Sequence, residues 1–255
     1  MTKHVVVVGG GISGLTVAHR LGRLPGVRVT LLEGSGDLGG KLRLGQVAGI
    51  TVDVGAEAML NRRPEAVALA HDVGLGAELV HPDTTTANLW NRNSMVPMPR
   101  TLMGVPGDIR ALDGVLSQKG LARALLEQVT PPSVSKRDLS IGQLIEDRFG
   151  REVTDRLVEP LLGGVYAGHA RQLSAQACVP QVFDLVKKRR SLTTAAAEVL
   201  AAAPTDVPVF AGIRGGMGRL PMALAEGSAA TIRTHAMVRD LARRPEGGWN
   251  LVVGS

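Results

Sequence analysis

Three glycines near the N-terminus have the spacing of a phosphate-binding turn. Gly9, Gly11 and Gly14 form the pattern G-x-G-x-x-G within "VVVVGGGISGL". The first glycine permits a tight turn, the second lets the backbone approach a pyrophosphate, and the third allows a helix to pack closely on a strand. Because the start of a helix also presents free N–H groups and a positive dipole, the pattern predicts a dinucleotide site.

The flanking residues have the pattern of a strand, a helix and a second strand. Val5 to Val8 is a run of four valines, and such a continuous β-branched run is typical of a parallel strand buried on both faces. Apolar residues recur at helical spacing from Leu15 to Leu24, and Pro25 with Gly26 ends the predicted helix. "VRVTLLE", from Val27, is predicted to form the second strand. The glycine turn therefore lies where a dinucleotide-binding βαβ unit requires it.

An acidic residue closes the second predicted strand. Glu33 follows Gly11 by 22 residues, which is the place where a carboxylate can accept hydrogen bonds from the ribose hydroxyls of a dinucleotide. The same negative charge opposes a 2′-phosphate, so NADP is disfavoured.

Two later segments favour FAD over NAD. In "DLGGKL", Gly39 and Gly40 allow a second close approach of the backbone, and Lys41 adds a positive charge beside it. "DVGAE", from Asp53 to Glu57, is a further glycine-containing segment. A cofactor that extends a ribityl chain across the domain would use such an approach. The alternative for "DLGGKL" is an ordinary glycine turn with a solvated lysine. An NAD-dependent dehydrogenase is an alternative function, since it would share the first βαβ unit, but it should lack both segments.

The composition argues against several classes of protein. With 255 residues and 44% hydrophobic content, the chain can bury a substantial core. The net charge of +6 comes with only 2% aromatic residues, so the scattered basic residues do not indicate nucleic-acid binding. Cys178 is the single cysteine, which precludes an internal disulfide and a cysteine-based metal site. The six histidines form no H-x-x-H or H-E-x-x-H pair, so no metal is expected.

The sequence predicts a cytoplasmic protein without a transmembrane segment, and leaves peripheral contact with a membrane open. No run of eighteen apolar residues occurs. No Ser-His-Asp, Cys-His or paired-carboxylate set stands out, so no catalytic residue is nominated.

The pattern divides the chain into three segments, 1–86, 87–204 and 205–255. The texture changes near Thr84, where proline-broken sequence favours short strands and turns. Helices are expected from Ser140, whose hydroxyl with Gln143 has a capping-box pattern, and over 153–161, 181–188 and 193–203. Glycines at 163 and 164 are expected to end a helix. After "PVFAGIRGGMGRLPMAL", the runs "ATIRTHAMVRDLARR" and "GWNLVVGS" return to strand-like alternation.

Together these motifs resemble a known family. "GGGISGL", Glu33, "DLGGK" and "DVGAEAM" are similar to the flavin-containing amine oxidase superfamily. "MGVPGD", "SIGQLIEDRFGREVTDRLVEPLLGGVYAG", "LS" at 173–174 and "GIRGGMGRLPMAL" resemble the FAD-dependent porphyrinogen oxidases of haem biosynthesis, most of all the soluble bacterial branch that oxidises coproporphyrinogen III. The other branch oxidises protoporphyrinogen IX. Members of the family are considerably longer, so the chain is expected to be a C-terminally truncated fragment with little activity alone.

The resemblance implies an α/β fold, in which a Rossmann-like FAD-binding domain carries an inserted substrate-binding and helical region and is incomplete at its C-terminus. It implies that the cofactor is held by Gly9, Gly10, Gly11, Ile12, Ser13 and Gly14 at the pyrophosphate, by Glu33 at the adenosine ribose, by Gly39, Gly40, Lys41, Gly55, Ala56, Glu57 and Ala58 on the flavin side, and by the backbone of Val238 at the adenine.

The same resemblance implies the chemistry. A porphyrinogen loses six electrons to become a porphyrin, so a two-electron flavin would act three times, with O2 as the final acceptor and peroxide as its product. The macrocycle carries propionates, for which arginine is a suited partner. Arg62 and Arg63 follow "DVGAEAM" closely enough to be candidate propionate ligands, although a solvated pair at the start of a helix is an equal alternative. Another flavin oxidase, or a fragment that binds FAD without turnover, stays open.

Overall fold

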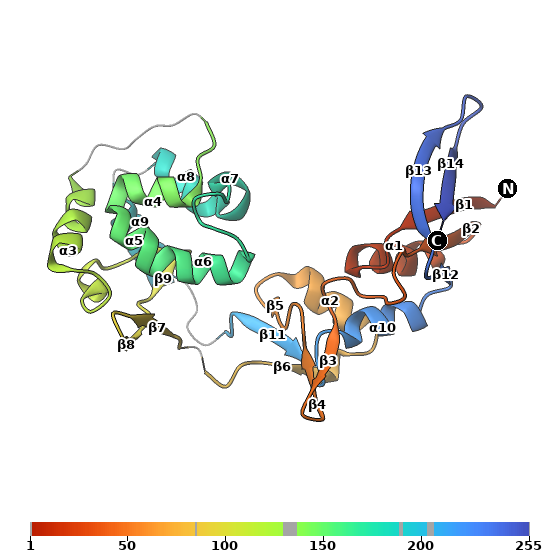
Figure 1. The fold of residues 1–255 in the computed structure, drawn as a ribbon, viewed down its shortest axis with the longest axis horizontal. Helices are drawn as coiled ribbons and strands as arrows, with labels where there is room; N and C mark the ends of the chain where they lie inside the picture. Colours follow the sequence, from red (N-terminus) through yellow and green to blue (C-terminus); the bar gives the residue numbers. More distant parts are fainter. Residues whose placement is uncertain (1, 85, 130–136, 189–190, 203–206, 255) are drawn as a thin grey trace. The chain divides into compact units, whose positions relative to one another are not determined.

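The structure, a computed structural model, describes residues 2–84, 86–129, 137–188, 191–202 and 207–254 (Figure 1). The chain forms two compact units. Unit 1 consists of Met1–Thr85 and Val207–Ser255, and unit 2 is Thr86–Asp206. Two distant parts of the sequence therefore share one unit. That these units are a cofactor domain and an inserted substrate domain stays a prediction.

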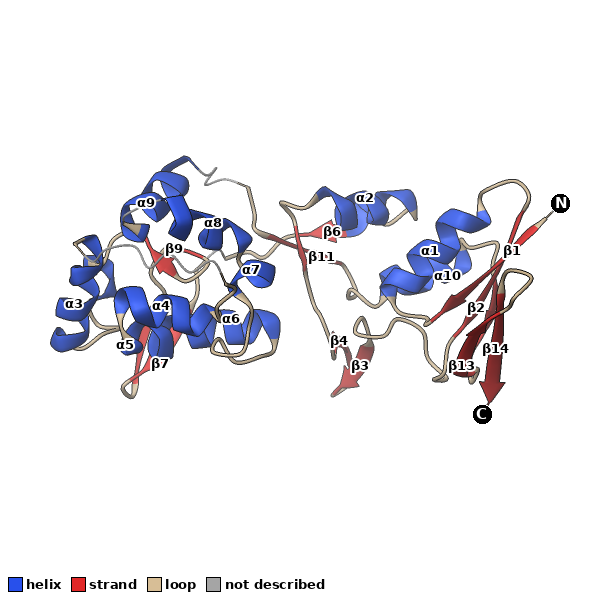
Figure 2. Cartoon of the chain, turned by 90° about the horizontal axis from the view of Figure 1, so that it is seen from above, coloured by secondary structure: helices blue, strands red, loops and turns tan. Residues whose placement is uncertain are grey.

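A parallel sheet and two helices form the first part of unit 1. The strands β1 (Lys3–Val8), β2 (Val27–Leu32) and β12 (Thr231–Arg233) lie in the order β1-β2-β12. Both pairings are parallel, which confirms the predicted βαβ unit. The helix between the first two strands, α1 (Ile12–Gly22), packs against β2 and α10 (Arg219–Glu226) (Figure 2). The core between them is aliphatic, with Leu15, Leu31 and Leu224 fully buried.

Short antiparallel sheets complete unit 1. The hairpin of β3 (Leu44–Val47) and β4 (Ile50–Asp53) follows the first βαβ unit. A three-stranded sheet then has the order β5 (Met59–Leu60), β11 (Phe210–Ile213), β6 (Leu79–Val80). The helix α2 (Pro64–Asp72) and the 3-10 turn η1 (Gly76–Glu78) connect β5 to β6. The hairpin of β13 (Met237–Arg243) and β14 (Trp249–Gly254) closes the described chain.

Unit 2 is mainly helical. Its helices are α3 (Gln118–Leu125), α4 (Ile141–Phe149), α5 (Arg151–Val153), the π-helix η4 (Thr154–Val158), α6 (Glu159–Tyr166), α7 (Ala175–Cys178), α8 (Pro180–Lys188) and α9 (Leu192–Ala202), with the 3-10 turns η2 (Arg110–Leu112) and η3 (Leu126–Gln128). The hairpins β7 (Asn88–Asn91) with β8 (Ser94–Pro97) and β9 (Thr101–Leu102) with β10 (Val105–Pro106) precede them. These are the short strands expected after Thr84.

A buried ion pair anchors the helices of unit 2. Arg148 Nη2 lies 2.6 Å from Glu127 Oε1, and the two residues are 1% and 0% exposed. The same carboxylate accepts hydrogen bonds from the backbone N–H of Leu192 at 2.6 Å and from the Ser191 hydroxyl at 2.9 Å. Because these groups lie at the start of α9, Glu127 caps a helix that begins 65 residues later in the chain.

One predicted helix end is wrong. Instead of stopping at Gly163 and Gly164, α6 runs through both and ends at Tyr166. Ala167 then takes the left-handed conformation, with φ 49°, that was expected of a glycine. The preceding residues already form a continuous helical segment whose buried side chains, including Leu157 and Leu162, hold the helix in place across the glycines. The predicted cap of α4 is confirmed, since Ser140 Oγ accepts from Gln143 N at 3.1 Å.

Candidate cofactor site

The first glycine turn has the geometry that its spacing predicts. Gly9 has φ +100°, and its N–H donates to the Leu32 carbonyl at 2.8 Å, so the turn begins directly at the ends of β1 and β2. A Cβ at position 14 would overlap the Gly9 carbonyl oxygen. Gly14 therefore lets α1 start close against the turn, as the sequence predicts.

The start of α1 is open where a diphosphate would lie. Gly11 is the N-cap of α1, no side chain caps the helix, and its first turn contains no acidic residue. A Cβ at Gly11 would meet nothing closer than Gly40 Cα at 4.0 Å. The backbone N–H groups there thus have room for an anion, and the residues fit the pyrophosphate of a dinucleotide.

Glu33 is fixed between the two strand ends. Its Oε2 accepts the Gly10 N–H at 2.6 Å, and its Oε1 accepts the Ser35 N–H at 2.7 Å and the Ser35 hydroxyl at 2.8 Å. The backbone N–H groups of Ser35 and Gly10 lower the pKa of the Glu33 carboxyl. Each oxygen retains acceptor capacity, so an ionised, oriented carboxylate is available to ribose hydroxyls. Sequence reasoning did not identify Ser35, although a hydroxyl two residues after the acid is a usable signal.

The second glycine turn lies against the first. Gly39 N donates to Gly10 O at 2.8 Å, and the Cβ position of Gly40 is 3.2 Å from Gly11 Cα. Behind this contact, Ala56 N donates to Lys41 O at 2.9 Å. The structure therefore brings the predicted segments 39–41 and 55–58 together with the first turn, as a cofactor that spans both would need. Whether each residue contacts the cofactor stays a prediction.

The start of β13 lies beside the turn that follows Glu33. Ala236 N donates to Glu33 O at 2.7 Å, and the side chain of Met237 covers Gly34. Val238, the predicted neighbour of the adenine, comes next and pairs with Val253. Its position in the fold fits that role, which stays a prediction.

Arg62 and Arg63 are exposed residues at the start of α2. Arg63 is the N-cap of this helix and Pro64 its first residue. Among the residues that the structure describes, neither guanidinium forms an ion pair. Both cations are thus available to a ligand, and within the described part of the chain no hydrogen bond or ion pair joins either side chain to Glu33 or the glycine turns.

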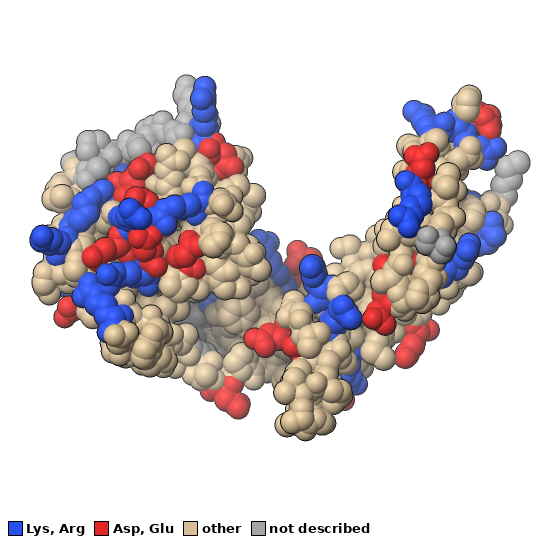
Figure 3. All heavy atoms as spheres, in the orientation of Figure 1, with Lys and Arg blue, Asp and Glu red and all other residues tan. Residues whose placement is uncertain are grey.

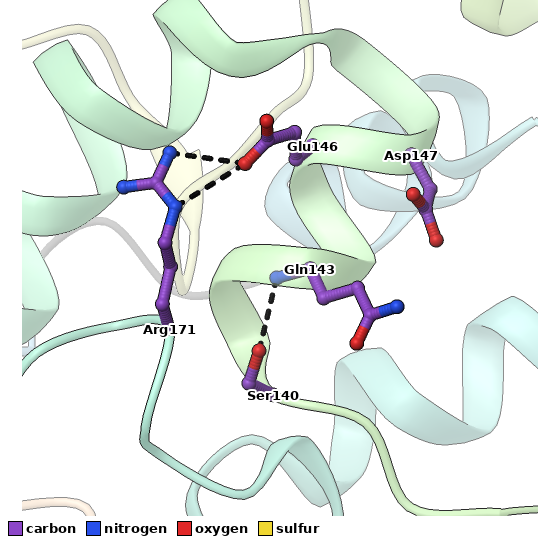
Figure 4. A pocket seen from close by; sticks show the side chains of 5 residues that line it. All are labelled: Ser140, Gln143, Glu146, Asp147 and Arg171. Atoms are coloured by element: carbon purple, nitrogen blue, oxygen red, sulfur yellow. Dashed lines mark hydrogen bonds and ion pairs between the residues drawn. The ribbon is translucent and has the colours of Figure 1, made fainter.

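A polar cavity of about 400 Å³ in unit 2 does not share this chemistry (Figure 4). Its one cation, Arg171, turns toward Glu146, with Nη2 to Oε2 at 3.0 Å, and pairs with Asp155 at 2.7 Å. Hydrogen bonds to Asp155 and Glu146 raise the pKa of Arg171. Because two carboxylates already neutralise this guanidinium, the cavity does not offer a propionate site. Figure 3 shows Lys and Arg side chains interspersed with Asp and Glu side chains on the visible face of this unit.

Polar contacts join α6 to the segment that follows it. The Tyr166 hydroxyl donates to the Cys178 carbonyl at 2.7 Å, and burial raises the pKa of Tyr166. His169 Nδ1 lies 2.9 Å from Glu159 Oε1, while Ala170 N donates to Glu159 Oε2. The hydrogen bond from His169 lowers the pKa of Glu159. These contacts explain the local conformation and assign no catalytic atom.

Within the described ranges, no group of three or more His, Cys, Asp or Glu residues could hold a metal ion. In the same ranges, none of the helices has the length and apolar character needed to cross a membrane.

Comparisons with known proteins extend this picture. The profile of the flavin containing amine oxidoreductase family matches residues 12–254. The chain is 36% identical over 199 residues to the coproporphyrinogen III oxidase of Bacillus subtilis, covering 74% of this chain and 42% of that protein. It is 34% identical over 249 residues to the coproporphyrinogen III oxidase of Mycobacterium tuberculosis, covering 96% and 54%.

A comparison with solved structures identifies the same kind of protein. A crystal structure from Exiguobacterium sp. 255-15, provisionally described as a protoporphyrinogen oxidase, superposes with a TM-score of 0.82 at 28% identity, over 99% of this chain and 56% of the other. The predicted α/β class with a Rossmann-like cofactor domain is thereby confirmed. The chain spans about half the length of the relatives it matches.

Proposed function

Because the chain belongs to the flavin containing amine oxidoreductase family, we propose that it is the cofactor-binding part of an oxidase that converts a porphyrinogen to a porphyrin in haem biosynthesis. The cofactor is FAD, as the sequence predicts. Two curated relatives that oxidise coproporphyrinogen III support that substrate, and the description of the Exiguobacterium structure supports protoporphyrinogen as the alternative.

The observation that carries this proposal in the structure is the position of Glu33. Its carboxylate joins the end of β2 to the first glycine turn through Gly10, so the ribose and the pyrophosphate of one dinucleotide can be held together. When bound, FAD supplies the capacity to accept two electrons with a proton. The chain's own residues bind and orient it: the open start of α1 takes the diphosphate, and the second glycine turn lies ready beside it.

The overall stoichiometry follows from the substrate. A porphyrinogen gives up six electrons and six protons, and three molecules of O2 accept them and leave as three molecules of hydrogen peroxide. We propose O2 as the acceptor because its reduction to peroxide takes up all the electrons and protons that the substrate releases, without a further reductant. The exposed cations of Arg62 and Arg63 are the candidate partners of the substrate's propionates.

The test has two stages. After the purified chain is titrated with FAD and unbound cofactor is removed, the protein should retain a flavin that absorbs at about 450 nm. Coproporphyrinogen III and protoporphyrinogen IX, each prepared anaerobically, are then supplied with O2 in parallel assays. Porphyrin fluorescence and peroxide are measured for this chain and for a full-length protein that contains residues 1–255 of this chain. Porphyrin from coproporphyrinogen III by the full-length protein is the expected result. Faster turnover of protoporphyrinogen IX would make it the substrate in place of coproporphyrinogen III. Oxidation of amines alone would overturn the proposal.

The propionate role has its own experiment. In the full-length protein, replacing Arg62 and Arg63 together by Ala should raise the KM for coproporphyrinogen while leaving the Kd for FAD unchanged. An unchanged KM would remove both residues from the site.

A further inference from the structure

Asp53 makes a contact that the sequence does not reveal. The residue ends β4, and its side chain reaches the turn between β11 and α10, which lies 164 residues later. Its Oδ2 accepts the Met217 N–H at 3.0 Å and its Oδ1 accepts the Gly218 N–H at 3.3 Å. Gly218 is the N-cap of α10 and has no side chain to fill that role. Asp53 therefore supplies, from a distant strand, the acceptor that the start of α10 requires.

The turn is pressed closely onto the β3–β4 hairpin. Leu44 pairs with Asp53 across the hairpin. A Cβ at Gly216 would overlap the Leu44 side chain, and one at Gly218 would lie 2.6 Å from Leu44 Cγ. Gly216 also has φ +102°. Only glycine fits at this position, since the close approach and the backbone conformation both exclude a side chain.

The hydrogen bonds of Asp53 complete a closed series of contacts between β4, α10 and the two glycine turns. From Asp53 the connection runs through α10 to Pro221, whose ring faces Gly39: a Cβ added at Gly39 would lie 3.2 Å from Pro221 Cγ. Gly39 in turn bonds to Gly10 in the first glycine turn. On the other side, Val54 N donates to Arg43 O at 2.9 Å, which ties β4 to the segment after Gly39. The second glycine turn is thus held by α10 on one side and by β4 on the other, and Asp53 links β4 to the start of α10.

We propose that Asp53 is a positioning residue, which holds the second glycine turn in the place where the flavin side of the cofactor needs it. This inference rests on FAD as the cofactor of the proposed function, and not on the identity of the substrate. Asp53 bonds to the turn before α10 and not to the first glycine turn, where the adenosine and the diphosphate are expected to bind. Its loss should therefore weaken binding of the flavin half and spare the adenosine half.

A helix cap without a role at the cofactor site makes a different prediction. If Asp53 only stabilised α10, its replacement would lower the melting temperature and would weaken every nucleotide equally, because α10 packs on α1. Affinity for FAD compared with affinity for ADP separates the two roles, since ADP lacks the flavin and its ribityl chain.

The experiment uses the whole chain with Asp53→Asn, in which one carboxylate oxygen is replaced by an NH2 group, which donates hydrogen bonds and cannot accept one. The control is Glu78→Gln. Glu78 also contacts the turn between β11 and α10, through exposed ion pairs with Arg214 and Arg219, each at 3.7 Å. Isothermal titration should show Kd for FAD raised about tenfold in Asp53→Asn, the equivalent of one lost capping acceptor, and Kd for ADP unchanged. Glu78→Gln should change neither.

A second variant serves if Asp53→Asn fails to fold. Pro221→Ala removes the contact with Gly39 and leaves the carboxylate in place, and it should likewise weaken FAD and spare ADP. Equal losses for FAD and ADP, or no loss for FAD, would overturn the inference in either variant. A wild-type chain that binds ADP but not FAD would overturn it together with the cofactor assignment. Binding of FAD without porphyrin formation by the full-length protein would defeat only the proposed function.

Discussion

The carboxylate of Glu33 and the backbone N–H of Gly10 are 2.6 Å apart, so the acid at the end of β2 is bonded directly into the turn that follows β1. This contact makes one site of two motifs that are 23 residues apart. It also places an ionised group where the ribose of a dinucleotide is expected, and keeps it there through a second bond to Ser35.

The lowered pKa of Glu33 predicts how stability depends on pH. A carboxyl whose pKa is lower in the folded state contributes stability above its unfolded value of 4.5, and that contribution is lost as the pH falls through the lower folded pKa. The melting temperature of Glu33→Gln should therefore lie below that of the wild type at pH 6, and the difference should shrink below pH 4.5. A constant difference from pH 3 to pH 6 would contradict the assigned hydrogen bonds.

Gly14→Ala should destabilise unit 1, because the added Cβ would overlap the Gly9 carbonyl oxygen. The expected loss is about 1–3 kcal/mol, the usual cost of forcing atoms into a packed site. Urea unfolding measures it, and ADP binding should weaken in parallel as α1 moves away from the turn. Unchanged binding and stability would mean that the helix does not start against this carbonyl.

Gly164→Ala should have the opposite effect. The position lies inside α6, and a Cβ there meets nothing within 4 Å. Alanine in a helix interior is favoured over glycine by about 0.5–1 kcal/mol. Urea unfolding of the transition that reports unit 2 should show this gain. A loss instead would indicate that the helix ends at the glycines, as the sequence alone suggested.

The buried pair in unit 2 should be sensitive to removal of one partner. Glu127→Gln leaves Arg148 buried with a neutral neighbour, and breaking such a pair costs about 3–5 kcal/mol. Chemical denaturation followed by far-UV circular dichroism gives the loss. The matched surface variant Asp155→Asn, at exposed ion pairs with Arg151 and Arg171, should lose no more than about 1 kcal/mol. Equal losses in the two variants would show that burial does not set the cost.

Features that depend on neighbouring residues were predictable from the sequence. The strand, glycine turn, helix and closing acid follow one another within 33 residues, and each has a local physical requirement that a residue type reveals. The cap of α4 by Ser140 is equally local, and it too was predicted correctly. The end of α6 was not, because packing along the preceding helix outweighed the low helix propensity of two glycines.

The sequence by itself determined the dinucleotide turn, its acidic partner and the family resemblance, since these lie in contiguous motifs. Only the tertiary structure decided which distant groups complete them: Asp53 at the start of α10, Glu127 at the start of α9, and the contact of Gly39 with Gly10. Aspartate and glutamate have the same appearance in a sequence whether they are solvated or bonded to a backbone N–H. The difference arises when folding brings an unpaired helix start within about 3 Å of the carboxylate, and no local pattern records that distance.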